Sequence, residues 1–241
     1  MKLIFVALIL FFTACAKIQT TDVAKPSFAV EYRGAMREMF ANGNIGGNIS
    51  LTEFRNKPHL YAVAPLEGLR GEITVLDGTS YVSFVRNNSV VVEKSWDAKA
   101  IFMVWAEVAE WREVSVPENV KTYAELEKFV AEAAKSANID ASPPFPFLLK
   151  GTPANVNWHI NNYVSDNTPL TQEKHDQAKF KGVLENEAVE IVGFYSDKHA
   201  GVFTHHTTNM HLHLRSASGN VMGHLDDITL NNGTSLYLPK S

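Results

Sequence analysis

Short runs of alternating apolar and polar residues recur along this chain, and that period of two predicts β-strands. In the first half of the chain the runs fall at residues 59–63, 73–76, 81–85 and 90–92. The pairs Asp77-Gly78 and Asn87-Asn88 stand between consecutive runs, and such pairs favour two-residue hairpin turns. The first half is therefore expected to contain an antiparallel meander.

Further strands are expected downstream. Residues 101–111 alternate aromatic and small side chains, and their dense apolar content predicts a strand that is buried on both faces. In the second half, strands are predicted within residues 147–164, around Gly151, and over residues 187–195. Residues 196–208 are predicted to form a long loop that leads into another strand.

Helical spacing is rarer in this sequence. A period near 3.6 predicts a helix over residues 28–42, and the clearest helix spans residues 121–138, where Thr122 and Glu125 form a capping box. A similar pattern at residues 50–53 predicts a short helix. Together the elements predict an α+β fold in two halves, each with a β-sheet that is mixed or rich in antiparallel pairs, with a few flanking helices.

Prolines suggest where the two domains divide. Three prolines lie within residues 142–146, where they disfavour regular structure. We expect an N-terminal α+β domain over residues 28–141 and a C-terminal, β-rich, metal-binding domain over residues 142–241.

The first residues have the pattern of a bacterial lipoprotein signal peptide, predicted over residues 1–15. Lys2 precedes an apolar stretch at residues 3–12, which is too short to span a bilayer. Cys15, the single cysteine of the chain, follows a small residue and is the predicted lipidation site. The alternative is a plain signal peptide with an incidental cysteine. Residues 16–27 are expected to form a flexible tether to a domain on the periplasmic or outer-surface side of the cell envelope.

Composition narrows the classes of partner. The chain has 241 residues, of which 45% are hydrophobic and 20% charged, with a net charge of −4. This composition is typical of a globular protein. No run of basic residues occurs in the sequence, so we expect no nucleic-acid partner and only a lipid anchor at the membrane.

Three histidines give the strongest chemical signal. His211 and His213 are alternate residues of an apolar run, so on a strand both imidazoles point the same way. Turn-forming residues follow at 216–220, and a hairpin there would bring His224 back beside the first two. Three converging imidazoles suit a tetrahedral metal with an open position, although a polar face without a metal is the alternative.

Two sequence blocks resemble the α-acetolactate decarboxylases. The first, the histidine block, is His211-Leu212-His213 followed by Gly223-His224 and Asp226. The second is residues 68–78, which read GLRGEITVLDG and are similar to that family's Leu-x-Gly-Glu-x-x-x-Leu-Asp-Gly signature. The resemblance implies zinc (Zn²⁺) bound by His211, His213 and His224, with Glu72 as the acid–base group. It implies decarboxylation of 2-acetolactate, a 2-hydroxy-3-keto acid, to acetoin and carbon dioxide through a zinc-stabilised enediolate. It also implies a fold of two similar β-rich domains and, since family members tend to form dimers, a homodimer.

The resemblance has two departures. His159 falls about where the family carries an active-site arginine, and the resemblance assigns it to the catalytic site in that place. A further family glutamate, carried on a C-terminal extension, has no counterpart before Ser241. Two alternatives therefore stand beside the decarboxylase: a lipoprotein that binds zinc or a small acid without turnover, and a metal-dependent hydrolase. Trp158 and Tyr163 are candidates to line the pocket.

Four polar residues near the histidine block have two interpretations each. His205 and His206 either belong to the site, as extra ligands or as a lid, or are, as we expect, part of a polar loop. Asp226 and Asp227 either orient His224, as carboxylates do for metal-bound imidazoles, or are solvated turn residues.

Overall fold

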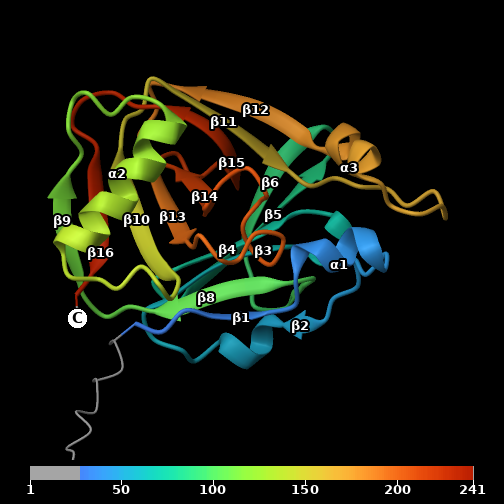
Figure 1. Ribbon diagram of the computed structural model, residues 1–241. Helices are drawn as coiled ribbons and strands as arrows, with labels where there is room; N and C mark the ends of the chain where they lie inside the picture. Colours follow the sequence, from blue (N-terminus) through green and yellow to red (C-terminus); the bar gives the residue numbers. More distant parts are fainter. Residues whose placement is uncertain (1–27, 241) are drawn as a thin grey trace, which may run out of the picture.

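Two large antiparallel β-sheets lie face to face in this protein, which we describe from a computed structural model over residues 28–240 (Figure 1). The first sheet has the strand order β1-β8-β3-β4-β5-β6. Its strands are β1 (Glu31–Arg33), β3 (Leu60–Pro65), β4 (Glu72–Leu76), β5 (Thr79–Arg86), β6 (Ser89–Lys94) and β8 (Met103–Glu107). The predicted α+β class with two antiparallel sheets is confirmed.

The second sheet has eight strands in the order β12-β11-β15-β14-β13-β10-β16-β9. Its strands are β9 (Trp111–Ser115), β10 (Phe145–Gly151), β11 (Asn155–Ile160), β12 (Phe180–Glu185), β13 (Val189–Tyr195), β14 (Met210–Ser216), β15 (Met222–Thr229) and β16 (Ser235–Pro239). The remaining elements are β2 (Ile49–Ser50) paired with β7 (Lys99–Ala100), the helices α1 (Met36–Ala41), α2 (Tyr123–Ser136) and α3 (Gln172–Ala178), and the 3₁₀ turns η1 (Leu51–Phe54) and η2 (Glu67–Leu69).

Strand β4 shows how the alternation of side chains separates core from site. Ile73 and Val75 point away from the eight-stranded sheet, into a small cluster that is completed by η1. Glu72 and Thr74 take the opposite face, where both approach His213 of β14. Because successive strand residues face opposite ways, this short strand supplies both packing and chemistry.

The main core lies between the sheets and beneath α2, which packs on β15. The predicted capping box of this helix is confirmed: the Thr122 side chain accepts from the Glu125 N–H, and the Glu125 carboxylate accepts from the Thr122 N–H. Leu126 and Val130 are fully buried. Each contributes roughly 2 kcal/mol by leaving water, which fixes the helix against the sheet.

Both predicted hairpin turns are confirmed. Asp77 and Gly78 have φ angles of 44° and 70°, and Asn87 and Asn88 have φ angles of 51° and 56°. Positive φ at both central residues is the geometry of a type I′ turn, which matches the twist of antiparallel strands. The strand predicted over residues 187–195 and the long loop after it are also confirmed.

The helix predicted over residues 28–42 is wrong for its first half. Residues 31–33 form β1 and pair with Met103–Trp105 of β8, so only Met36–Ala41 is helical. Gly34 separates the two elements with a φ of 74°, which a continuing helix cannot contain. The helical period is a property of these residues alone, whereas β1 forms because it pairs with the distant strand β8.

Two other predicted elements differ from the structure, one in its bounds and one in its type. The strand expected over residues 101–111 covers only Met103–Glu107, and Trp111 begins β9, which pairs with β16 in the other sheet. The turn at residues 50–53 is a 3₁₀ turn without the expected cap, because the Ser50 hydroxyl bonds the Thr52 hydroxyl instead.

The predicted boundary between two domains near residues 142–146 stays a prediction. Strand β10 already contains Phe145 and Pro146, and β9 from the first half of the chain joins the second sheet. Cys15, the signal peptide and the tether lie outside the described residues. Within residues 28–240, no helix has the length and apolar content to cross a bilayer.

Candidate functional site

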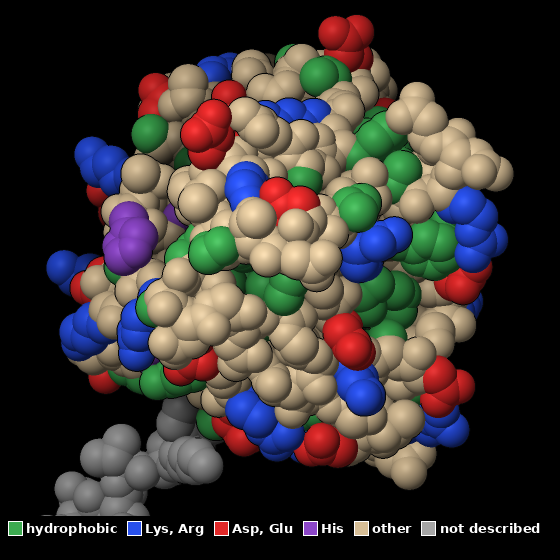
Figure 2. All heavy atoms as spheres, turned by 90° about the vertical axis from the view of Figure 1, so that its right-hand side faces the viewer, with side chains coloured by type: hydrophobic (Ala, Val, Ile, Leu, Met, Phe, Trp, Pro, Cys, Tyr) green, Lys and Arg blue, Asp and Glu red, His purple; other side chains and the backbone are tan. Residues whose placement is uncertain are grey.

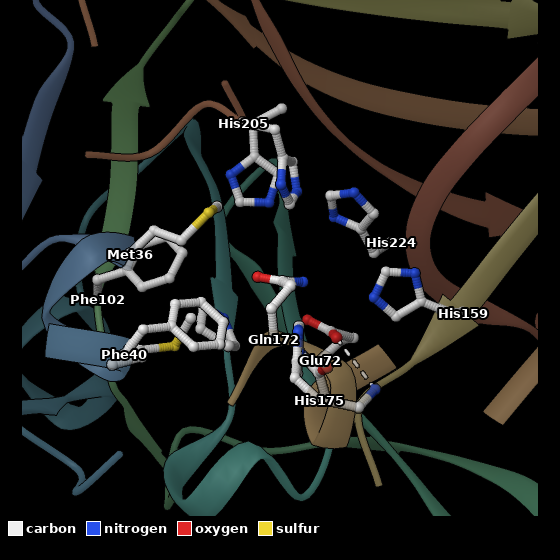
Figure 3. A pocket seen from close by; sticks show the side chains of 13 residues that line it. Met36, Phe40, Glu72, Phe102, His159, Gln172, His175, His205 and His224 are labelled. Atoms are coloured by element: carbon white, nitrogen blue, oxygen red, sulfur yellow. Dashed lines mark hydrogen bonds between the residues drawn. The ribbon is translucent and has the colours of Figure 1, made fainter. Parts of the chain in front are cut away.

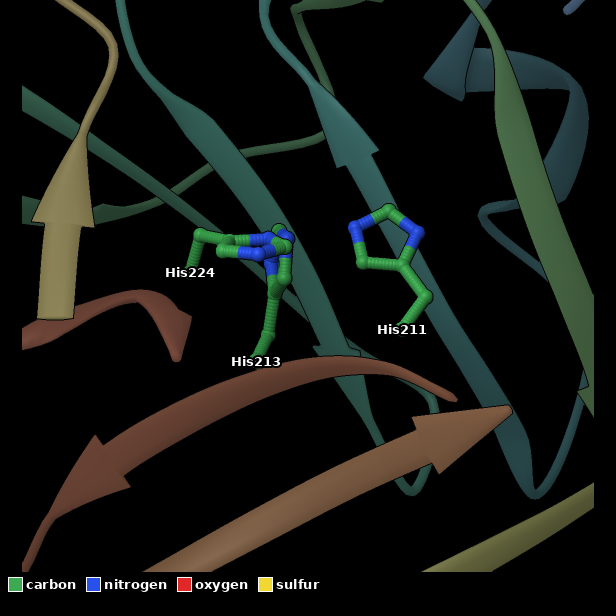
Figure 4. Close-up of side chains that lie close together, drawn as sticks. All are labelled: His211, His213 and His224. Carbon is green, nitrogen blue, oxygen red and sulfur yellow. The ribbon is translucent and has the colours of Figure 1, made fainter. Parts of the chain in front are cut away.

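Three histidines, His213, His224 and His159, form a row across neighbouring strands of the eight-stranded sheet. The strand register pairs His213 of β14 with His224 of β15, and His224 with His159 of β11. Directly paired residues of adjacent strands share a face of the sheet. The hairpin predicted from the turn at residues 216–220 therefore brings His213 and His224 together as expected (Figure 4).

His211 completes the predicted ligand set. It precedes His213 by two residues on β14 and so lies on the same face. One nitrogen from each of His211, His213 and His224 lies within 4.8 Å of the other two. Their ring centroids are 5.2 Å (His211–His213), 5.0 Å (His211–His224) and 5.6 Å (His213–His224) apart. The exposed fractions of 3%, 1% and 9% show that the set is buried.

The hydrogen bonds leave nitrogen atoms of this set without a protein partner. The His213 Nδ1 lies 3.0 Å from the Thr74 hydroxyl oxygen. An imidazole that donates from Nδ1 presents a lone pair at Nε2, and this buried Nε2 has no hydrogen-bond partner among the described residues. The buried Nδ1 of His211 is likewise unpartnered within residues 28–240. Buried polar atoms normally have partners, so these atoms fit the role of metal ligands.

Burial also sets the protonation state of the three imidazoles. Loss of solvent lowers the pKa of His213 to about 3 and holds the pKa values of His211 and His224 well below their ordinary value. Neutral imidazole is the form that binds a metal. The site therefore presents three neutral donors at neutral pH.

Glu72 faces the histidines from the other sheet. Its Oε2 lies 3.7 Å from the Nε2 of His213, and its Oε1 accepts a hydrogen bond of 3.2 Å from the Asn161 N–H. Only 2% of the residue is exposed, and this burial raises the pKa of the carboxyl well above its usual value. The preceding Gly71 is required, because a Cβ there would lie 2.2 Å from the carbonyl oxygen of Ser83. The predicted glutamate is thus in the site.

His159 joins the site beside His224, with 4.8 Å between the ring centroids. Its Nδ1 lies 2.8 Å from the Asp226 Oδ1, where the register between β11 and β15 shifts. One of the two interpretations had Asp226 orient His224, but this carboxylate orients His159 instead. Asp227 is exposed. Burial is the main cause that lowers the pKa of His159, although Asp226 opposes that shift.

A cavity of about 50 Å³ opens beside these groups (Figure 3). One wall is apolar and includes Met36 and Phe40 of α1 together with Phe102. The other walls carry Glu72 and the imidazoles, and no lysine or arginine lines the cavity in the described part of the chain. The space suits a small molecule with one apolar side and several oxygens.

Sequence reasoning missed several residues of this cavity. His175 and Gln172 come from α3, a polar segment with no local signal, and the Nε2 of His175 lies 2.7 Å from the Asn161 Oδ1. The candidates Trp158 and Tyr163 do not line the cavity. Trp158 lies next to His159 on β11 and packs toward Phe180, on the other face of the sheet.

His205 and His206 each fit a different one of the two interpretations. His206 is exposed, as expected for a polar loop. His205 is half-buried and lines the cavity, and its ring centroid lies 5.3 Å from that of His224. His205 therefore lies in the expected loop, but its side chain lines the cavity and is not exposed.

Charged side chains of both signs are interspersed on the face of the molecule beside this cavity (Figure 2). The view shows no broad basic patch of the kind that binds nucleic acid.

Known proteins resemble this chain in sequence and in fold. Residues 32–238 match the family described as Alpha-acetolactate decarboxylase. The structure of alpha-acetolactate decarboxylase from Bacillus subtilis strain 168 has a TM-score of 0.69 at 16% identity and covers 88% of this chain and 86% of its own. The acetolactate decarboxylase from Bacillus subtilis subspecies spizizenii has a TM-score of 0.68 at 16% identity, with coverages of 88% and 87%.

A third structure, from Staphylococcus aureus, is described as a protein of unknown function similar to alpha-acetolactate decarboxylase. It has a TM-score of 0.67 at 15% identity, with coverages of 88% and 86%. At these identities the structures establish a shared fold. No curated protein sequence matches this chain.

Proposed function

This chain belongs to the alpha-acetolactate decarboxylase family, and we propose that it is a metal-dependent carboxy-lyase acting on 2-acetolactate or a closely related 2-hydroxy-3-keto acid. The products would be acetoin, or the corresponding hydroxyketone, and carbon dioxide. One observation carries the proposal: three buried imidazoles on one sheet lie beside the buried carboxyl of Glu72 on the other sheet.

Zinc is the ion we propose for His211, His213 and His224. The donor set fits it, because three neutral nitrogens lie within 4.8 Å of one another and two of the buried nitrogens have no other partner within residues 28–240. When bound, such an ion supplies positive charge for the oxygens of a substrate that becomes electron-rich as carbon dioxide leaves.

Glu72 is the proposed proton donor. The Asn161 N–H holds Oε1, so Oε2 is the oxygen left to face the histidines. Burial favours the protonated carboxyl, which can give its proton to the carbon that has lost carbon dioxide. A nearby cation would favour the carboxylate, and the balance of these two effects sets the working pKa.

His159 is the proposed substitute for the family arginine. Its Nδ1–H donates to Asp226, so its Nε2 is free to accept a hydrogen bond. Burial keeps this imidazole neutral, so it can orient a substrate hydroxyl but supplies no fixed charge to a carboxylate.

The test is one sample of purified full-length protein in detergent. Bound zinc is measured first, and acetoin is then measured after addition of racemic acetolactate. The proposal expects stoichiometric zinc and acetoin formation that stops on chelation. A sample without metal, or with acetoin formation that chelation leaves unchanged, contradicts it.

The absence of a cationic residue from the described cavity lining favours one second candidate, a lipoprotein that binds zinc or a small acid without turnover. Zinc without acetoin would support this candidate. A metal-dependent hydrolase, the other alternative, would instead release product from an ester or amide on the same zinc-loaded sample.

We further propose that the protein is lipid-anchored through Cys15 at the bacterial cell envelope, from the sequence pattern alone. A homodimer remains the expectation for assembly.

A further inference from the structure

His205 lies in a loop, and neither sequence block that resembles the decarboxylases contains it. It lies between β13 and β14, and its side chain enters the cavity from the side opposite Glu72 (Figure 3). His205 lies outside the helices and strands, directly before a turn at residues 206–207.

The ring of His205 lies near the rings of two members of the three-histidine set, His224 and His211. Four imidazoles on one tetrahedral ion, with metal–nitrogen bonds of about 2.1 Å, would have ring centroids roughly 5 Å apart. The His205 centroid lies 5.3 Å from that of His224 and 6.3 Å from that of His211. The first distance matches the tetrahedral spacing and the second exceeds it by about one ångström, whereas no ring contact joins His205 to His213 among the described residues, so His205 must move toward the set to bind the ion.

His159 does not compete for this place. Its ring lies beside that of His224, and its Nδ1 is already bonded to Asp226. Among the described residues, His205 is the remaining imidazole with rings of two of the three predicted ligands nearby.

We propose that His205 is a fourth imidazole ligand of the ion held by His211, His213 and His224. This inference rests on the metal-binding part of the proposed function. It adds a ligand at the position that catalytic zinc sites keep open for water or substrate. The chemical class of ion is a divalent cation that accepts four nitrogens, such as zinc or cobalt. Binding of an oxygen ligand would then compete with His205.

The experiment is a cobalt titration of metal-free, full-length protein in detergent, followed by visible absorption. We expect His205→Ala to weaken cobalt binding at least about 10-fold and to change the absorption bands, because a water replaces a nitrogen. The matched control is His206→Ala, which alters the exposed neighbour and should behave as the unaltered protein. His211→Ala serves as the reference for loss of a ligand.

Further measurements keep the result independent of folding. Thermal unfolding of each metal-free variant shows whether it folds, and His205→Gln repeats the test with a side chain of similar reach. X-ray absorption of the zinc-loaded, unaltered protein counts the ligands directly, and four imidazole nitrogens are expected. Three nitrogens and one oxygen, or equal cobalt binding by His205→Ala and His206→Ala, would overturn the fourth ligand alone. Failure of the unaltered protein to bind cobalt and zinc would overturn the metal site as well.

Discussion

Glu72 and His213 face each other across the interface between the two sheets, with 3.7 Å between Oε2 and Nε2. Both are almost fully buried, at 2% and 1% exposure. A buried carboxyl beside a potential metal ligand can either bind the ion or handle a proton. The position of Asn161, which bonds only Oε1, leaves Oε2 available for the proton.

Glu72→Gln is predicted to keep zinc and lose turnover. The amide retains the shape of the side chain and can still accept from Asn161, but it cannot give up a proton in the same way. We expect kcat to fall by about 10²- to 10⁴-fold at unchanged zinc content. Acetoin formation and metal analysis on one preparation measure both effects. Glu67→Gln, which alters an exposed residue of η2, is the control. Full activity in Glu72→Gln would remove Glu72 from the mechanism.

Thr74→Val is predicted to weaken the metal site without touching a ligand. The Thr74 hydroxyl pairs with the His213 Nδ1, and valine has the same shape without that oxygen. Groups that orient a metal-bound imidazole commonly contribute about 10- to 100-fold in affinity. Competition with a chromogenic chelator measures the change. Thr79→Val, in the partly exposed hairpin next to β4, should bind zinc as before, and equal affinities of the two variants would contradict the orienting role.

The stability of the metal-free protein is predicted to fall as pH falls from about 6.5 to 4. Burial lowers the pKa of His175 to about 4 from its ordinary value of 6.5. Between these values the unfolded chain binds the proton and the folded chain does not, so acid favours unfolding. His175 alone accounts for up to about 3 kcal/mol over this range.

His175→Gln tests this assignment. Glutamine can still donate to Asn161 but takes up no proton, so the decrease in unfolding free energy between pH 7 and pH 4.5 should be smaller in the variant. Urea unfolding at the two pH values measures it. The exposed His206→Gln should retain the full decrease, and identical decreases for all three proteins would show that His175 is not a source of the acid sensitivity.

Local patterns predicted the parts of this fold that are local. The turns at Asp77-Gly78 and Asn87-Asn88 fix their hairpins within a few residues, and the spacing of His211, His213 and His224 depends on one hairpin. The α2 cap is also local. These features could be predicted because no distant segment decides them.

Other parts of the site depend on packing between distant segments. His175 and Asn161 meet because α3 folds over the end of β11, and Phe102 reaches the cavity through the pairing of β8. The helical period over residues 28–42 misled for the same reason, since β1 forms only against β8. His205 belongs to a loop whose path no local residue pattern sets.

Cys15→Ser is predicted to release the protein from membranes. If Cys15 carries a diacylglyceryl group, its two acyl chains provide the anchoring, because a single chain binds membranes only marginally. The unaltered protein should partition into the detergent phase after cell fractionation, and the variant into the aqueous phase. Ser27→Ala, in the predicted tether, is the control. A Cys15→Ser protein that still partitions with detergent would contradict lipidation.

His159→Arg is predicted to tighten the binding of an anionic substrate. The described cavity lining has no lysine or arginine, and burial keeps His159 neutral, so no side chain there offers fixed positive charge to a carboxylate. An arginine would carry that charge at every pH, and Asp226, now bonded to His159, would be its partner. A charge-assisted hydrogen bond of about 1.5 kcal/mol corresponds to a roughly 10-fold lower KM for acetolactate. His159→Gln is the control for loss of the imidazole without gain of charge, and its KM should not fall below the original value. If the arginine variant folds, as its thermal unfolding would show, and its KM is unchanged or higher, then the substrate carboxylate does not lie beside residue 159.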